Sequence, residues 1–235
     1  MPFAGRVEIF GEALTKESAP RLRRRLGLVF QDPDDQVFMP RVWDDVAFGP
    51  KNLRWPEDRV RETVERALRE LGIADLRDRA PHRLSHGQKK RVAIAGVLAM
   101  EPEVLLLDEP TTGLDMRTRS QLLARLFATR RTMIVTTHLV DDFAGLVDRI
   151  VVLDGRVVAD GPPREVLLRD DLLERANLEV PVMARLLRAL RDRGYPLDDL
   201  PASVEAAVDL LARDPGPAAG ERELRVARRP GRGAA

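Results

Sequence analysis

The chain has 235 residues, of which 44% are hydrophobic and 33% are charged. This composition favours a globular protein of one large or two small domains. The 39 basic and 38 acidic residues nearly cancel, so the net charge of +1 gives no indication of nucleic-acid binding. Because the chain contains no cysteine, disulfides and thiolate metal sites are excluded, and a reducing compartment is expected.

No apolar run approaches the roughly 18 residues that a membrane-spanning helix needs. Residues 1–6 lack the order of charged and then apolar residues that is typical of a signal peptide. We therefore expect a cytoplasmic protein, and we expect any contact that it makes with a membrane to be peripheral.

The first half of the chain alternates between strand-like and helical patterns. Residues 6–10 alternate like an edge strand, and residues 26–30 form an apolar run that ends in the polar loop 31–35. Residues 56–72 place apolar side chains on one face and predict an amphipathic helix that begins near a proline and ends at a glycine. Residues 88–100 are apolar on most sides, which predicts a buried helix.

Three short apolar runs follow, at residues 104–107, 133–135 and 150–153, with helical segments between them. Such an alternation is typical of parallel strands joined by crossover helices, and it predicts an α/β fold. Residues 154–155 form a tight turn into the apolar segment 156–159, so we expect the sheet to finish with an antiparallel pair.

The end of the chain differs in character from the predicted sheet. Residues 182–190 and 204–211 carry apolar side chains at helical spacing, and they predict a helical appendage over 166–213. From residue 214 onward, proline, glycine, alanine and arginine dominate, so residues 214–235 are predicted to be a disordered tail. The main domain is expected to cover residues 1–165.

Two adjacent acids, Asp108 and Glu109, end the buried strand 104–107. The carboxyl ends of parallel strands are where open α/β sheets bind ligands. One acid could hold Mg²⁺ through water, and the other could polarise a water molecule for phosphoryl transfer. On the dipeptide alone, a strand that ends in two solvated acids is an equally good interpretation.

Four further residues have both a functional and a structural interpretation. Ser85 suits a helix N-cap and Gly87 lets a ligand approach backbone amides, as in a phosphate site, but an ordinary capped helix would look the same. His138 follows a strand and could hydrogen-bond a γ-phosphate, although such a histidine can be purely structural. Gln31 could join a Mg²⁺ shell or simply complete a turn.

Taken in order, these segments resemble the ATP-binding-cassette (ABC) ATPases over residues 5–165. The resemblance rests on Gln31, Leu84–Gln88, Leu107–Pro110, Gly113–Asp115 and His138. It implies a P-loop NTPase-like α/β sheet core with a helical subdomain at about residues 40–100. It also implies ATP and Mg²⁺ as cofactors.

The resemblance assigns a role to each matching residue. It implies that Glu109 and His138 are the catalytic glutamate and the switch histidine, and that Gln31 and the Walker B aspartate Asp108 hold Mg²⁺. The implied nucleotide contacts are Gln31, Ser85, Gly87, Gln88, Asp108 and the D-loop aspartate Asp115. His86 departs from the glycine that is usual in the signature motif.

Residues 31–38, 46–50 and 84–91 resemble the energy-coupling-factor importers of cobalt, nickel and vitamins, and residues 177–182 favour the cobalt or nickel branch. This likeness implies a second ABC ATPase subunit, identical or different, and an integral membrane transporter component as partners, with no nucleic acid. The location is then peripheral, on the inner face of the cell membrane. Soluble ABC proteins of DNA repair or translation are disfavoured, because their usual insertions or duplicated cassettes are not visible.

Aromatic residues of the helical subdomain lie near the expected contact with the membrane component. They are Phe38, Trp43 and Phe48. Such side chains could anchor in a pocket of the partner, or they could pack within the subdomain's own core, which is the favoured interpretation for Phe48.

The sequence contains no glycine-rich phosphate loop that ends in Gly-Lys-Ser or Gly-Lys-Thr, and residues 11–18 lack its second glycine and its spacing. We therefore expect an N-terminally truncated domain with an unpaired sheet edge beside residues 133–135 and poor solubility. In one explanation, Met1 is an internal methionine of a complete transport ATPase. In the other, the chain is a catalytically dead partner whose signature completes an intact subunit's ATP site, or it is a non-functional gene fragment.

Overall fold

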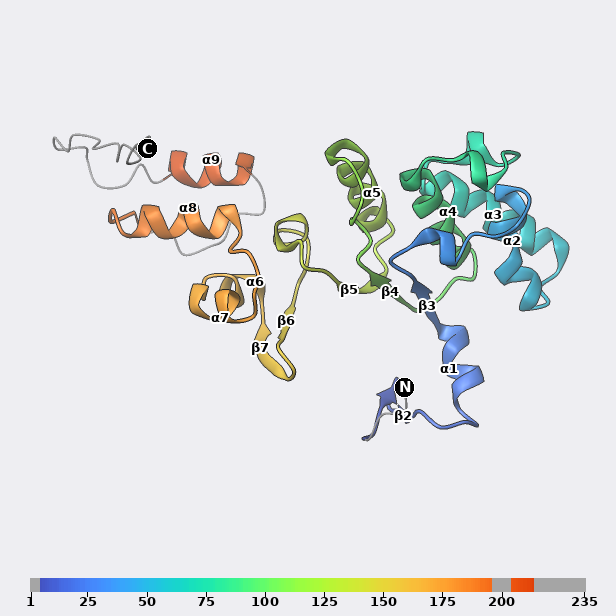
Figure 1. Ribbon diagram of the computed structural model, residues 1–235, viewed down its shortest axis with the longest axis horizontal. Helices are drawn as coiled ribbons and strands as arrows, with labels where there is room; N and C mark the ends of the chain where they lie inside the picture. Colours follow the sequence, from blue (N-terminus) through green and yellow to red (C-terminus); the bar gives the residue numbers. More distant parts are fainter. Residues whose placement is uncertain (1–4, 196–203, 214–235) are drawn as a thin grey trace, which may run out of the picture. The chain divides into compact units, whose positions relative to one another are not determined.

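The computed structural model describes residues 5–195 and 204–213 (Figure 1). The chain forms two compact units, residues 1–139 and 140–235. Within the described residues, no helix combines the length and the apolar character needed to cross a membrane. The predicted domain boundary at residue 165 stays a prediction, and the predicted disordered tail 214–235 lies outside the described residues.

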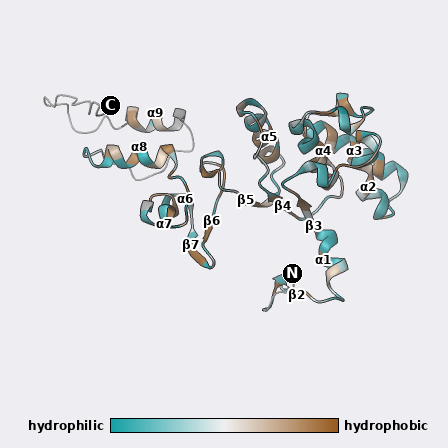
Figure 2. Cartoon of the chain, in the orientation of Figure 1, coloured by the Kyte–Doolittle hydropathy of each residue, from teal (hydrophilic) through white to brown (hydrophobic). Residues whose placement is uncertain are grey.

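The first unit is built around a parallel sheet of three strands, which confirms the predicted α/β class. The strands are β3 (Leu26–Val29), β4 (Val104–Asp108) and β5 (Thr132–Thr136), in the order β3-β4-β5. The register pairs Leu26 with Val104, and Asp108 with Thr136. Leu105 and Leu107 of the central strand are buried, and Figure 2 shows the hydrophobic character of β4.

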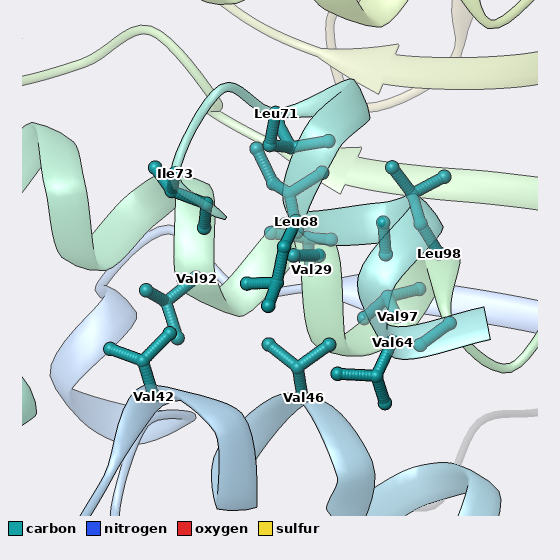
Figure 3. Packing of buried hydrophobic residues seen from close by; sticks show 14 of the residues in the cluster. Val29, Val42, Val46, Val64, Leu68, Leu71, Ile73, Val92, Val97 and Leu98 are labelled. Atoms are coloured by element: carbon teal, nitrogen blue, oxygen red, sulfur yellow. The ribbon is translucent and has the colours of Figure 1, made fainter. Parts of the chain in front are cut away.

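Helices complete this unit, and the longest of them pack around one apolar cluster. They are α1 (Ala19–Arg25), α2 (Val42–Asn52), α3 (Glu57–Glu70), α4 (His86–Leu98) and α5 (Met116–Ala128). Figure 3 shows branched side chains from β3, α2, α3 and α4 packed together, including Val29, Val46, Leu68 and Val97. Helix α3 starts after Pro56 and its exit turn uses Gly72 at φ +62°, close to the predicted limits.

The predicted strand at residues 6–10 is shorter in the structure. Strand β1 (Glu8–Ile9) pairs antiparallel with β2 (Glu12–Ala13). Phe10 and Gly11, at φ +55° and +76°, make the turn between them. The alternating pattern therefore marked a two-residue hairpin arm and not a long edge strand.

The second unit contains its own small sheet and short helices. Strands β6 (Ile150–Leu153) and β7 (Val157–Gly161) precede α6 (Pro163–Val166), α7 (Asp170–Arg175), α8 (Val182–Arg191) and α9 (Val204–Arg213). Helices α8 and α9 confirm the predicted helical segments, and α8 has both hydrophobic and hydrophilic sides (Figure 2). The predicted antiparallel pairing of residues 150–153 with residues 156–159 is confirmed. The prediction that residues 150–153 join the parallel sheet is wrong, because β6 and β7 form a separate two-stranded sheet.

The three-stranded sheet also presents apolar side chains to solvent. In the part of the chain that the structure describes, β5 pairs with β4 alone, so its other edge carries no strand. Ile134 of β5 is 57% exposed, and Leu28 and Phe30 are each 45% exposed. These features agree with the expected unpaired edge, whereas the expected poor solubility stays a prediction.

The close packing of β3 on α4 gives a test of this fold. A Cβ at Gly27 would collide with Val97 and would lie 2.9 Å from Pro102 Cγ, so Gly27→Ala should destabilise the protein by about 1–3 kcal/mol. A Cβ at Gly96, in the interior of α4, meets its nearest atom at 3.7 Å. Gly96→Ala should therefore be neutral or stabilise by about 0.5–1 kcal/mol. Urea unfolding measures both, and equal effects of the two substitutions would contradict this packing.

Candidate functional site

Parallel pairing brings the predicted functional side chains of the first unit to the edge of the sheet that is formed by the carboxyl ends of its strands. Gln31 lies two residues beyond β3, Asp108 is the last residue of β4, and His138 lies two residues beyond β5. The three strands run side by side in the same direction (Figure 1), so their carboxyl ends meet. This edge is where an open α/β sheet binds its ligand.

Glu109 is the most heavily hydrogen-bonded of the predicted site residues. His138 Nδ1 lies 2.7 Å from Glu109 Oε1, and the backbone N–H of His138 donates to the same oxygen at 3.0 Å. The hydroxyl of Thr112 donates to Glu109 Oε2 at 2.9 Å, and that of Thr137 donates to it at 3.3 Å. The structure thus joins the two residues that were predicted to be catalytic in one direct contact.

These contacts set the charge of the Glu109 carboxyl group. Partial burial alone would raise its pKa, but hydrogen bonds from His138 and Thr112, together with the charge of His138, outweigh that effect and lower the pKa below its ordinary value. The group is therefore an ionised acceptor at neutral pH. An ionised carboxylate held by a histidine at a sheet edge can accept a proton from a bound water molecule.

Gln31 and Asp108 face the same open groove, which has a volume of about 420 Å³. The other residues that line it are Phe30, Asp32, Asp35, His86, Thr112 and Gly113. The hydroxyl of Thr136 donates to Asp108 Oδ1 and orients that carboxylate. Mg²⁺ prefers oxygen ligands and usually keeps several waters, so an amide oxygen and a carboxylate in one groove fit this ion. Within the described residues, no cluster of three or more acidic or histidine side chains is arranged to hold a metal.

The predicted signature begins helix α4 as a reciprocal cap. The backbone N–H of Gln88 donates to Ser85 Oγ at 3.3 Å, and the N–H of Ser85 donates to Gln88 Oε1 at 3.0 Å. This confirms Ser85 as the N-cap. A Cβ at Gly87 would lie 2.6 Å from Thr118 Cγ2, so in this fold the glycine lets α4 pack closely on α5. The ligand contacts predicted for Ser85, Gly87 and Gln88 stay predictions.

Asp115 has a structural partner and lies outside the lining of the groove. It is the N-cap of α5, where the backbone N–H of Thr118 donates to its Oδ1 at 3.0 Å. Hydrogen bonds from the hydroxyl and the backbone of Thr118 lower the pKa of Asp115. Its predicted contact with nucleotide stays a prediction.

The structure adds contributors that the sequence patterns did not reveal. Thr112 and Thr136 orient the two acids, and the buried Lys90 lies between the loops that carry Gln31 and Glu109. One feature of the sequence indicates that Lys90 is buried. It is three residues after Gly87 and four before Ile94, so helical spacing places it on a buried face.

The aromatic side chains of the helical region divide into two groups. Phe38 and Phe48 form an edge-to-face pair with ring centroids 4.9 Å apart, and they remain 62% and 41% exposed. Trp43 packs partly against the main core, and the guanidinium of Arg77 lies 4.6 Å from its ring centroid. Phe48 thus has a neighbour within its own subdomain, but the pair still presents aromatic surface to solvent.

The chain is similar to known proteins in both sequence and fold. The family model described as "ABC transporter" matches residues 1–112. The chain is 48% identical to the energy-coupling factor transporter ATP-binding protein EcfA of Methanoculleus marisnigri over 84% of the chain and 73% of that protein. It is also 48% identical to the nickel import ATP-binding protein NikO of Rhodobacter capsulatus, over 75% of each. The structure of cbiO1 from Clostridium perfringens, part of the ABC transporter complex cbiONQ, superposes with a TM-score of 0.67 at 41% identity over 79% of this chain and 76% of that one.

The lowered pKa of Glu109 predicts a pH dependence of stability. A carboxyl whose pKa falls on folding stabilises the protein above its unfolded value, near 4.5, and that contribution is lost as the pH falls through the lowered value. Wild type should therefore lose stability relative to Glu109→Gln as the pH falls from 4.5 downward. Urea unfolding at a series of pH values measures the difference, with the exposed Glu62→Gln of α3 as the control. A wild-type advantage that does not change with pH would contradict the assigned contacts.

Proposed function

The chain belongs to the ABC transporter ATP-binding proteins of the energy-coupling-factor type, and we propose that it couples ATP hydrolysis to import of a nickel or cobalt ion or a vitamin. The observation that carries the proposal is the ionised Glu109 carboxylate, held by His138 and Thr112 beside the groove that contains Gln31 and Asp108. The nickel-importing relative supports the metal branch.

In the proposed reaction, each residue at the sheet edge has one task. Glu109 accepts a proton from, or orients, the water that attacks the γ-phosphate. His138 fixes the position of that carboxylate through its ring and its backbone N–H. Gln31 and Asp108 would hold Mg²⁺, which when bound neutralises charge on the phosphate oxygens. ATP itself would lie along the groove, with its phosphates toward Asp108.

The 235 residues contain no Gly-Lys-Ser or Gly-Lys-Thr sequence, and the proposed reaction needs a phosphate loop that acts with Gln31 and Asp108. A second role needs no such loop in this chain. Ser85 and Gln88 fix the start of the 13-residue helix α4, and a helix N-terminus is a favourable place for a phosphate. We infer that this helix start serves the ATP site of a second ATPase subunit.

The proposed membrane partner would dock on the helical subdomain. Phe38 and Phe48 give a compact aromatic surface there, and exposed aromatic side chains are favoured as anchors in partner pockets. Such docking would place the chain at the inner face of the cell membrane. The proposed assembly thus contains two ATPase subunits and an integral membrane component.

Removal of the Glu109 charge tests the proposed chemistry. In the complex purified through a tag on this chain, Glu109→Gln should lower the turnover number for ATP by about 10²-fold or more, because general base assistance is lost. Binding of Mg-ATP should persist. The matched control is Glu103→Gln, one residue before β4, which removes a surface contact with Arg25. Steady-state hydrolysis that is undiminished in Glu109→Gln would remove this residue from the catalytic role.

The half-site role is tested separately. The chain is co-expressed with an ATPase partner that contains its own phosphate loop, and the partner's turnover is measured with wild type and with Ser85→Arg. The bulky arginine side chain at the start of α4 should block the phosphate-binding position and abolish the partner's turnover. Arg83→Ala, on the exposed turn before the signature, is the control. Unchanged turnover with Ser85→Arg would contradict the half-site role and would leave the proposed role of Glu109 untouched.

A further inference from the structure

Lys90 is a buried charge that the proposed reaction does not use. It lies on the second turn of α4, and its side chain has no exposure to solvent. The flanking helix positions Gly87 and Ile94 are also buried, so the ammonium group is inside the first unit. Burial of an ammonium without partners is strongly unfavourable, and its contacts therefore matter.

Both partners of the ammonium are main-chain carbonyls of functional loops. Lys90 Nζ donates to the carbonyl oxygen of Gln31, in the loop after β3. It also lies 3.4 Å from the carbonyl oxygen of Glu109, in the loop after β4. An ammonium carries three N–H donors, so one side chain can hold both loops at once. The same helix begins at the signature residue Ser85.

The surrounding charges make this position tolerable for a cation. Burial lowers the pKa of Lys90, while the carboxylates of Asp32, Asp108 and Glu109 act in the opposite direction. Asp32 comes from the loop after β3, and Asp108 and Glu109 come from the end of β4 and the loop after it. The ammonium thus lies between two negatively charged segments, and it contacts the backbone carbonyl oxygens of Gln31 and Glu109.

The backbone of Glu109 is held in an unusual conformation. Its φ of +43° lies in the left-handed region, which a residue with a side chain rarely adopts. Two hydrogen bonds fix it there: its N–H donates to the carbonyl oxygen of Thr136 at 3.0 Å, and its own carbonyl faces Lys90. This conformation directs the carboxylate toward His138 and Thr112.

We propose that Lys90 is a positioning residue that holds the Gln31 loop and Glu109 in one arrangement, so that a shift of either loop is transmitted to the other. The inference rests on the proposed ATPase function for its effect on turnover, but the physical coupling of the two loops does not depend on hydrolysis. Lys90 touches neither water nor nucleotide in this scheme.

The test replaces Lys90 by methionine, which has a similar length and no donor, and by glutamine, which keeps N–H donors on a shorter neutral side chain. The matched control is Lys89→Met. The ammonium of Lys89, the neighbouring residue, binds the Asp34 carboxylate at 2.6 Å, and it contacts neither the Gln31 carbonyl nor the Glu109 carbonyl. Hydrogen–deuterium exchange is followed in the full chain by mass spectrometry, over residues 30–36 and 108–114. The turnover number and KM for ATP are measured in the complex purified through this chain.

We expect Lys90→Met to speed exchange in both segments and to lower the turnover number about tenfold or more, since small misplacements of catalytic groups are costly. KM should change less, and Lys90→Gln should be intermediate. Lys89→Met should affect at most residues 30–36 and leave turnover near wild type. If Lys90→Met does not fold, the glutamine variant is judged in its place.

Exchange that changes in one segment only, or turnover equal to that of Lys89→Met, would overturn the coupling. A defect confined to the amount of folded protein, with normal turnover per folded molecule, would also overturn it. If the wild-type complex hydrolyses no ATP, the proposed function fails, and the exchange data alone then decide the coupling.

Discussion

The parallel pairing of β4 with both β3 and β5 is the constraint on which the rest of the first unit depends. The register of the pairs buries Leu105 and Leu107 and leaves Asp108 at the end of the strand, opposite Thr136. A slip of one residue would turn Leu107 outward and carry Asp108 into the core. The same pairing therefore secures the core and places the acid at the sheet edge.

The site is held by contacts to the main chain as much as by side chains. Glu109 follows β4 directly and adopts a left-handed conformation that its hydrogen bonds with Thr136 and Lys90 maintain. Backbone conformations of this kind cost about 1–3 kcal/mol and persist only where the surroundings determine them. Here the surroundings include the strand, the buried lysine of α4 and the contact with His138. A carboxylate that is held rigidly can meet a water molecule in a single orientation, which suits the proposed role of Glu109.

Much of the fold could be predicted from local patterns, because each pattern reports one face of one element. The apolar run at 104–107 and the acids after it defined the central strand and its end, and the spacing of Val60, Val64 and Leu68 defined α3. The antiparallel pairing of residues 150–153 with the segment after them was predicted, but that the pair forms a sheet of its own was not. A short apolar run predicts a strand, but the sheet that the strand joins depends on tertiary neighbours that are not encoded within the run.

The site was predicted less completely, for a related reason. Asp108, Glu109 and His138 lie at strand ends, where sequence position alone places them together. To predict the role of Lys90, one must know which loops contact α4. To predict the packing role of Gly87, one must know that Thr118 of another helix is its neighbour. Such tertiary neighbours leave only weak traces in a single sequence, such as a charged residue on an otherwise buried helix face.

A structure of the complex purified through this chain, formed with Mg²⁺ and a non-hydrolysable ATP analogue, tests the central claim most directly. We predict that the γ-phosphate lies in the groove beside Asp108, with the Glu109 carboxylate facing it, or that it lies against the start of α4 when the nucleotide belongs to a second subunit. A well-defined nucleotide that touches neither Asp108 nor Ser85 would contradict the assignment of this sheet edge and this helix to ATP.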